Sequence, residues 1–233
     1  MSQNSLCTRE VPAVRRVLIV DDHPVVRHGL RYVMENAGDL TVCGEAETAV
    51  EARAAIERFN PDMLICDISL RQVDGIELVR LLRAHYPKLP ILVLSALDES
   101  IYAERMLALG VNGYIMKQAP TELFLASVRR VLEGNIYVSD AISSVMLTKF
   151  AAGDVYLSAD PMNRLTNREL QILHMIGKGA STRETAQLLH LSIKTVESHR
   201  QRIKRKLNLS SGTQLLRYAV LSHAQSSASL PAA

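Results

Sequence analysis

The chain has 233 residues, of which 48% are hydrophobic and 22% are charged, with a formal net charge of +3. This length allows one large or two small domains with a sizeable core, and the composition excludes disordered and fibrous classes. The N-terminus lacks an apolar signal-peptide core and no run reaches ~18 apolar residues, so we expect a cytoplasmic protein without a membrane segment.

Charge is unevenly distributed along the chain. Residues 1–134 carry 15 basic and 18 acidic side chains, whereas residues 161–233 carry 11 basic and 3 acidic ones. An acidic front and a strongly basic C-terminal part favour a polyanion as the partner of the C-terminal part.

The first half alternates short apolar runs with segments of helical spacing. The runs that predict strands are Val17–Val20, Leu40–Cys43, Met63–Cys66, Ile91–Leu94 and Gly113–Met116. Strands that alternate with helices predict an α/β fold with a doubly wound, five-stranded parallel sheet. Such sheets bind their ligands at the carboxyl ends of the strands.

Polar side chains stand where four of these strands end. They are Asp21, Asp22, Asp67, Ser95 and Lys117. A single strand-end aspartate is usually a turn or helix cap, but four matching strand ends favour a common site. Three carboxylates in one crevice repel one another unless a cation lies among them, and oxygen donors suit Mg²⁺. Because a lysine and a hydroxyl suit phosphate oxygens, the set predicts a metal-assisted phosphoryl-transfer site.

The domain boundaries follow from helix and loop signals. Pro120 and Gly134 bound the last helix of the first domain, and the next residues are rich in Ser, Ala and Asp, as is typical of a linker. The expected division is an N-terminal extension (1–14), the α/β domain (15–134), a linker (135–162) in which 141–150 can be helical, a small all-α domain (163–222) and a disordered tail (223–233).

Three helix-start signals recur in the C-terminal part. Thr166 and Ser181 are each followed three residues later by glutamate, which fits the capping box, and Ser192 can cap a third helix. A fourth helix is expected over Gly212–Leu221. Short helices joined by tight turns resemble a helix-turn-helix.

The third of these helices is strongly basic, with six basic side chains and one acidic side chain over residues 194–206. A run of charged residues is usually a solvated helix face, so the spacing of the residues has to distinguish such a face from a DNA-binding surface. At ~100° per residue, the inward face holds Val196, His199, Ile203 and Leu207, and the outward side holds Lys194, Ser198, Gln201 and Arg205, flanked by Glu197, Arg202 and Lys204. Base-reading and phosphate-binding side chains on one face suit a helix in the major groove of DNA.

The strand-end residues also resemble a known family, the receiver domain of bacterial response regulators. The matching order is Asp21-Asp22, Asp67 followed by Asp74-Gly75, Leu94-Ser95-Ala96 and Gly113-Tyr114-x-x-Lys117. The resemblance covers roughly residues 15–134. It implies a flavodoxin-like sheet with the phosphoacceptor at the end of the third strand.

The receiver resemblance implies a role for each polar residue of the crevice. Asp67 would accept a phosphoryl group from a sensor histidine kinase, and Lys117 would bind phosphate oxygens. Asp22, Asp67 and the backbone carbonyl of Ser69 would hold Mg²⁺, with Asp21 assisting through water.

The same resemblance implies a switch pair and shows one departure. Ser95 and Tyr114 would reorient when the phosphate attracts the serine hydroxyl. Arg71 stands four residues after the acceptor, where receivers commonly have proline. Because this changes loop stiffness and local charge, the family's phosphorylation rate and phosphate lifetime are not carried over to this chain.

A second resemblance, over about residues 163–222, is to the LuxR-type helix-turn-helix. Its motifs are Leu165-Thr166-x-Arg168-Glu169, Gly179-Ala180-Ser181-Thr182-Arg183-Glu184-x-Ala186 and Ser192-x-Lys194-Thr195-Val196-Glu197-x-His199. The resemblance implies base contacts by Glu197, Ser198 and Gln201 and phosphate contacts by Lys194, Thr195, Arg202 and Lys206. Glu197 stands where many members of the family have lysine. Its carboxylate can accept a hydrogen bond from the amino group of cytosine, so the preferred DNA sequence should differ from that of those members. The helix from Gly212 would pair two copies, with recognition helices ~34 Å apart.

Together the two halves look like a response regulator of the NarL/FixJ class. The expected function is DNA-binding transcriptional regulation, with phosphorylation of Asp67 controlling dimerisation and DNA binding. The expected partners are a sensor histidine kinase, promoter DNA, RNA polymerase and a second copy of the chain.

Three alternatives remain at this stage. One is a receiver-type regulator whose DNA binding is not gated by phosphorylation, and another is a phosphoacceptor adaptor that does not bind DNA. The third, an aspartyl-phosphate hydrolase of the haloacid dehalogenase type, is weaker because Ser69 occupies the position of its second aspartate. The chain also lacks a Gly-rich phosphate loop of the P-loop kind, so we do not expect an enzyme.

Overall fold

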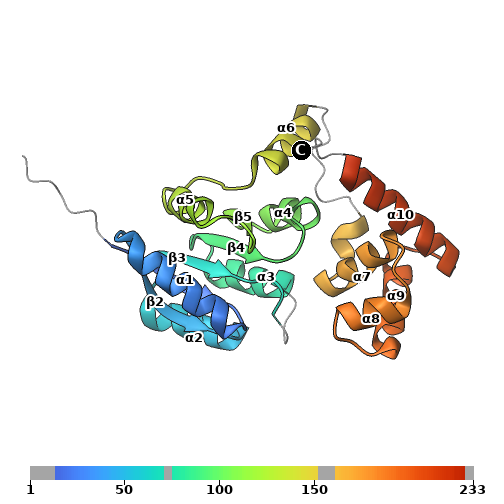
Figure 1. Ribbon diagram of the computed structural model, residues 1–233, viewed down its shortest axis with the longest axis horizontal. Coiled ribbons are helices and arrows are strands. Elements are labelled where there is room, and N and C mark those ends of the chain that lie inside the picture. The colour runs from blue at the N-terminus through green and yellow to red at the C-terminus, as the bar shows by residue number, and fades with distance from the viewer. Residues whose placement is uncertain (1–13, 71–74, 152–160, 229–233) are drawn as a thin grey trace, which may run out of the picture.

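The structure, a computed structural model, describes residues 14–70, 75–151 and 161–228. Arg71, Asp74, nearly all of the expected N-terminal extension and the last five residues lie outside the described residues. The first domain is a parallel sheet of order β2-β1-β3-β4-β5, which confirms the predicted fold class (Figure 1). Its strands are β1 (Arg15–Val20), β2 (Leu40–Ala46), β3 (Met63–Cys66), β4 (Ile91–Ser95) and β5 (Gly113–Met116).

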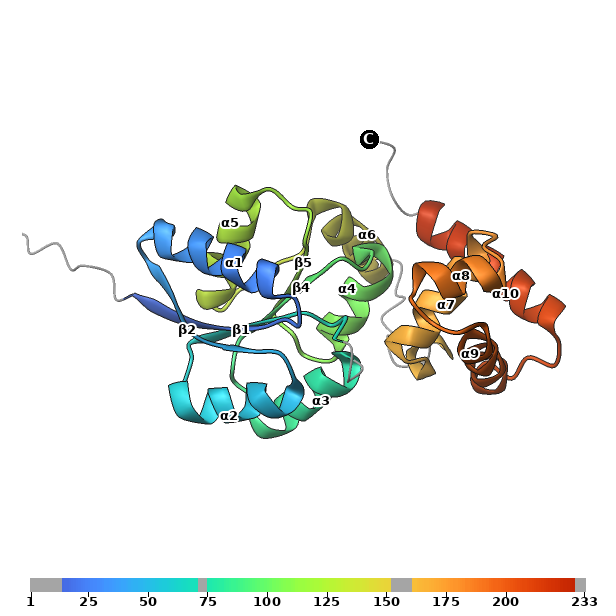
Figure 2. The ribbon, with the colours of Figure 1, turned by 60° about the horizontal axis from the view of Figure 1, so that its bottom comes forward.

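Helices cover both faces of the sheet. Figure 2 shows α1 and α5 on one face and α2 and α3 on the other. Successive residues of a strand point to opposite faces, so Val17 and Ile19 enter the core beneath α1 and α5, while Leu18 and Val20 enter the other core. The helices of this domain are α1 (Pro24–Ala37), α2 (Ala49–Phe59), α3 (Gly75–His85), α4 (Glu99–Ala108) and α5 (Thr121–Leu132).

The segment expected to be a linker contains a helix, α6 (Asp140–Ala151), as its apolar residues allowed. This helix contacts α4. Ile142 is 5% exposed, and the Ser139 hydroxyl donates to the Glu99 carboxylate at 2.7 Å. Residues 140–151 therefore extend the first domain rather than only connecting it to the second.

The second domain is all-helical, with its core formed by α7, α9 and α10. Both capping boxes are present, at Thr166 with Glu169 and at Ser181 with Glu184, and Ser192 accepts a hydrogen bond from the backbone of Thr195. These findings confirm the three predicted helix starts. The elements are η1 (Pro161–Arg164), α7 (Asn167–Gly177), α8 (Thr182–Leu188), α9 (Ile193–Lys206) and α10 (Gly212–Ala228).

The end of α10 differs from the expectation. We expected a helix to residue 221 and a disordered tail from residue 223, but the helix continues to Ala228. Serine and alanine both tolerate a helix, and no glycine or proline interrupts the chain before Pro231. The tail expectation was therefore wrong for residues 223–228. No helix in the described ranges is long and apolar enough to cross a membrane.

The two domains meet where α7 begins. Figures 1 and 2 show the second domain beside α3 and α4, with α7 nearest to them. The Tyr102 hydroxyl of α4 donates to the backbone carbonyl of Asn167 at 3.3 Å, and Arg105 donates to the carbonyl of Leu165. The Asn167 side-chain amide in turn donates to the carbonyl of Ile68 at 3.4 Å. The loop after β3 is thus in direct contact with the helical domain.

Candidate functional site

Lys117 joins the two buried aspartates at the carboxyl edge of the sheet. Its ammonium nitrogen lies 2.7 Å from Oδ2 of Asp67 and 2.6 Å from Oδ2 of Asp21. Each aspartate is 2% exposed. Strands β1, β3 and β5 therefore bring together three residues that span nearly a hundred positions of the sequence.

The ammonium group is held charged by its partners. Burial is the largest single influence and on its own would lower the pKa of Lys117. The charges of Asp67 and Asp21 and the hydrogen bonds to them outweigh burial, and the pKa is raised. A permanent cation beside Asp67 suits the binding of phosphate oxygens.

His23 completes a cluster of possible metal ligands, and the sequence reasoning did not single it out. Its Nδ1 lies 2.9 Å from Oδ1 of Asp22 and 3.1 Å from Oδ1 of Asp21. One ligand atom from each of these three residues and from Asp67 lies within 4.8 Å of the others. Three carboxylates suit a hard divalent cation, so the donor set fits Mg²⁺. The signal in the sequence was its position directly after the aspartate doublet.

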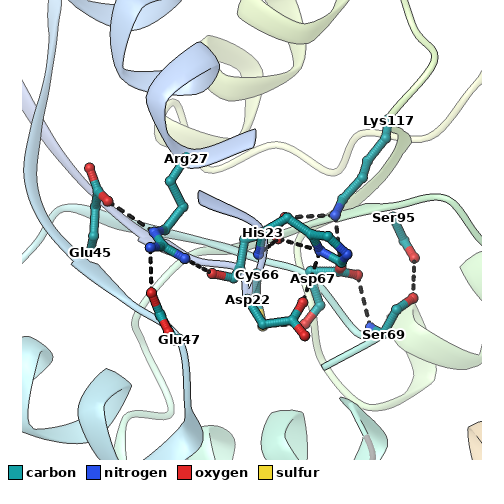
Figure 3. A network of polar contacts seen from close by, with 11 residues as sticks. Asp22, His23, Arg27, Glu45, Glu47, Cys66, Asp67, Ser69, Ser95 and Lys117 are labelled. Atoms are coloured by element: carbon teal, nitrogen blue, oxygen red, sulfur yellow. Dashed lines mark hydrogen bonds and ion pairs between the residues drawn. The ribbon is translucent and has the colours of Figure 1, made fainter. Parts of the chain in front are cut away.

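Arg27 supports the crevice from beneath and was also missed. Its guanidinium donates to the backbone carbonyl of Asp21 at 2.6 Å, to Glu45 at 3.0 Å and to Glu47 at 2.5 Å (Figure 3). Burial alone would lower the pKa of Arg27, but the two glutamates raise it. This network fixes the backbone that carries the aspartate doublet. Acidic residues at the end of β2 were the available signal.

The loop after Asp67 is tightly held. The backbone N–H of Ser69 donates to Oδ1 of Asp67 at 2.8 Å. The ammonium group of Lys117 donates to the other oxygen, so both oxygens of Asp67 are held in place by N–H donors.

Gly75 lets α3 begin close to this loop. A β-carbon on Gly75 would lie 2.4 Å from the backbone of Ile68, so only glycine fits there.

Ser95 and Tyr114 both hold Leu97 in the loop between β4 and α4. The Ser95 hydroxyl accepts from the backbone N–H of Leu97 at 3.2 Å, and the Tyr114 hydroxyl donates to the carbonyl of Leu97 at 2.8 Å. Ser95 Oγ also lies 3.3 Å from Ser69 Oγ. Tyr114 is fully buried, and burial raises its pKa. The two predicted switch residues thus act on one residue of this loop.

Leu97 also faces the helical domain. It lines a pocket between the domains together with Tyr102 of α4 and with Gln171, His174 and Met175 of α7. Leu97 therefore connects the hydrogen bonds of Ser95 and Tyr114 to the domain interface.

Most of the predicted DNA-contacting side chains lie on the exposed side of α9. Those exposed to solvent are Lys194, Glu197, Ser198, Gln201, Arg202 and Arg205. Val196 and Ile203 are fully buried, which confirms the predicted inward face. The first domain contacts the start of α7 and leaves this face of α9 uncovered.

Two predicted phosphate contacts have other partners here. The ammonium group of Lys206 lies 2.6 Å from the carboxylate of Glu169, which is 2% exposed. The Thr195 hydroxyl lies 2.8 Å from Oγ of Ser192. Lys206 thus ties the end of α9 to the start of α7, and Thr195 belongs to the cap of α9.

Helix α10 carries an uncovered apolar stripe. Leu216, Val220 and Leu221 are 47%, 46% and 54% exposed, whereas Leu215 and Ala219 are buried against the rest of the domain. The stripe occupies the outer side of the helix that was expected to pair two copies.

Family models match both parts of the chain. Residues 17–129 match the response regulator receiver domain, and residues 163–219 match the bacterial regulatory proteins of the luxR family. The oxygen regulatory protein NreC of Staphylococcus epidermidis is 35% identical over 210 residues, covering 88% of this chain and 96% of that protein. NreC of Staphylococcus aureus is 34% identical over 209 residues, with the same coverage.

Solved structures of similar sequence share the fold. RcsB of Salmonella enterica serovar Typhimurium, bound to the promoter rprA in the presence of the phosphomimetic BeF₃⁻, is 30% identical with a TM-score of 0.54. The match covers 88% of this chain and 98% of RcsB. A LuxR-family response regulator from Aurantimonas has a TM-score of 0.54 at 28% identity, covering 61% of this chain and 99% of that chain.

Proposed function

This chain belongs to the two-component response regulators that join a receiver domain to a luxR-type DNA-binding domain, and we propose that Asp67 is the residue through which it is phosphorylated. Members of this family are transcription regulators rather than enzymes, and phosphorylation controls them. The observation that carries the assignment is the position of Asp67. It is a buried carboxylate at a strand end, in contact with Lys117 and beside two further aspartates.

The residues of the crevice suit transfer from a phosphohistidine of a sensor kinase. An oxygen of the Asp67 carboxylate attacks phosphorus, the phosphorus–nitrogen bond breaks, and its electron pair stays on the kinase imidazole. An aspartyl phosphate remains on this chain. Lys117, already 2.7 Å from Asp67, is placed to bind an oxygen of the transferred group. The Ser95 hydroxyl can donate a hydrogen bond to another oxygen of the transferred phosphoryl group.

Mg²⁺ is the cation that we assign to the cluster. Asp22 and Asp67 would hold it together with the backbone carbonyl of Ser69, and Asp21 would act through water. When bound, the ion neutralises negative charge on the phosphoryl oxygens. The protein residues position the acceptor, and Arg27 keeps the Asp21 backbone in place.

We propose that phosphate acts on the domain interface through two loops. Asn167 contacts the residue directly after Asp67, and Leu97 connects Ser95 and Tyr114 to the same interface. If the phosphate draws the Ser95 hydroxyl away from Leu97, the surface that supports α7 changes. Such a shift requires that the phosphate favours one arrangement of the two domains over the other.

The proposed output is dimerisation followed by promoter binding. Because α9 keeps its outward face exposed, we propose that gating acts on pairing through the apolar stripe of α10 rather than by uncovering α9. Glu197, Ser198 and Gln201 would read bases, and Lys194, Arg202 and Arg205 would bind phosphates. We also propose that a sensor histidine kinase and RNA polymerase are partners of this chain and that it works in the cytoplasm.

A phosphorylation assay tests the acceptor assignment. The full chain is incubated with Mg²⁺ and acetyl phosphate, and the intact mass is measured. We expect the gain of one phosphoryl group in the wild type and none in Asp67→Asn. The matched control is Asp62→Asn, because Asp62 lies before β3 at the opposite edge of the sheet and binds Arg16. Phosphorylation of Asp67→Asn at the wild-type rate would contradict the assignment.

A further inference from the structure

The position of His23 is fixed by its neighbours in the chain. It follows the aspartate doublet and precedes Pro24, which opens α1. A residue before proline is restricted to extended conformations, and His23 has φ −102° and ψ 108°. Its backbone N–H donates to Oδ1 of Asp21 at 2.8 Å. Only the side-chain torsions remain free, so the imidazole is held at the rim of the crevice.

The imidazole points to the same carboxylates that would hold a cation. Nδ1 contacts Asp22 and Asp21 at 2.9 Å and 3.1 Å, and Figure 3 shows the ring beside Asp67 and Lys117. The ring is half exposed, so it can adjust its angle to an ion. The crevice therefore offers one nitrogen donor among three carboxylates.

From this geometry we propose that His23 supplies a nitrogen ligand to the divalent cation and shifts the metal preference of the site. The inference rests on the proposed metal site and extends it. Oxygen-only sites suit Mg²⁺, whereas imidazole favours transition-metal ions in the order of the Irving–Williams series. With His23 as a ligand, the ratio of Co²⁺ to Mg²⁺ affinity is higher than it is for the same site with oxygen ligands alone. The ring binds as neutral imidazole through one nitrogen, with its proton on the other.

The test uses Co²⁺ and Mg²⁺ as probes on the full chain. Co²⁺ shifts the proton resonances of a ligating imidazole far outside the normal NMR range, which identifies the ligand directly. The variant is His23→Asn, because asparagine is a good helix N-cap and preserves the start of α1. The matched control is His28→Asn, which changes an exposed histidine of the same helix.

We expect shifted imidazole resonances in the wild type and in His28→Asn, and none in His23→Asn. The ratio of Co²⁺ to Mg²⁺ affinity, measured by calorimetry, should fall at least about tenfold in His23→Asn, since loss of even an outer-shell partner has an effect of that size. Co²⁺ binding without imidazole resonances, or an unchanged affinity ratio, would overturn the inference while leaving the Mg²⁺ site intact. Failure of the wild type to bind either ion would overturn the metal site itself.

Discussion

The side-chain amide of Asn167, at the first turn of the DNA-binding domain, donates to the backbone carbonyl of Ile68, the residue directly after Asp67. The donor and acceptor atoms are 3.4 Å apart and buried. Tyr102 binds the backbone of the same asparagine. The helical domain therefore rests on the loop that carries the proposed phosphoacceptor.

Removal of this contact should loosen the domain interface. We expect Asn167→Ala to increase the DNA affinity of the unphosphorylated protein severalfold, because the hydrogen bond that holds the helical domain on the loop after β3 contributes about 1 kcal/mol. Fluorescence anisotropy with a labelled operator measures the change. Asn36→Ala is the matched control, since its amide binds Tyr32 on α1 away from the interface. Equal affinities of Asn167→Ala and the wild type would argue against a restraining role.

The hydroxyl of Tyr114 should transmit the phosphate signal without taking part in transfer. We expect Tyr114→Phe to be phosphorylated at the normal rate but to dimerise less in response. The reason is that the backbone of Leu97 loses its hydrogen bond from Tyr114 and keeps the one to Ser95. Mass spectrometry and sedimentation follow the two properties separately. Tyr32→Phe, which changes an exposed tyrosine, is the control. A parallel loss of phosphorylation would place Tyr114 in the transfer step instead.

The Glu169–Lys206 ion pair should make the helical domain sensitive to acid. Burial on its own would raise the pKa of Glu169. The hydrogen bonds from Lys206 and Thr166 and the charge of Lys206 outweigh burial, so the pKa of Glu169 is lowered from 4.5. A carboxyl with a lowered pKa stabilises the fold above its ordinary value, and this stability is lost as pH falls through the lowered value.

Glu169→Gln should therefore flatten the acid side of the stability profile and cost about 2 kcal/mol at neutral pH. Thermal unfolding of the full chain in a pH series measures both effects. Glu184→Gln is the control, because Glu184 occupies the same capping-box position on α8 and, in the described part of the chain, binds Ser181 rather than a lysine. Identical stability profiles of Glu169→Gln and Glu184→Gln would contradict a stabilising role of the Glu169–Lys206 pair.

Base-reading and phosphate-binding residues of α9 should respond differently to substitution. Arg205→Ala should weaken binding to all sequences and reduce the salt slope of log K by about 1. Glu197→Ala should relax the preference at one base pair, with a loss of about 1–3 kcal/mol of discrimination. Arg217→Ala removes the same charge from α10 and serves as the control. A uniform effect of Glu197→Ala on all sequences would contradict base reading.

The sequence predicted the sheet, both capping boxes and the convergence of Asp21, Asp67 and Lys117. It did so because strand ends are marked by abrupt changes from apolar to polar residues, and parallel strands bring those ends to one edge. Arg27 was not predicted, because its role depends on the approach of Glu45 in β2 and of Glu47 directly after β2. Helical spacing alone gives no sign of such a partner.

Contacts between the domains were equally beyond sequence reasoning. Asn167 was part of no predicted site, since its partner Ile68 lies 99 positions earlier. The LuxR-type resemblance implied a DNA phosphate contact for Lys206, but in the structure its ammonium group pairs with the buried carboxylate of Glu169. A basic side chain can serve an internal ion pair as well as DNA, and only the fold distinguishes them.

The central claim, that phosphate on Asp67 controls DNA binding, is tested most directly by selection from a randomised DNA pool. The selection is run with the full chain, with and without Mg²⁺ and beryllofluoride as a phosphate mimic. We expect a palindromic site to be enriched only with the mimic, because pairing through α10 places two recognition helices about one DNA turn apart. Equal enrichment in both arms would contradict gating by Asp67, and no enrichment in either arm would contradict sequence-specific DNA binding.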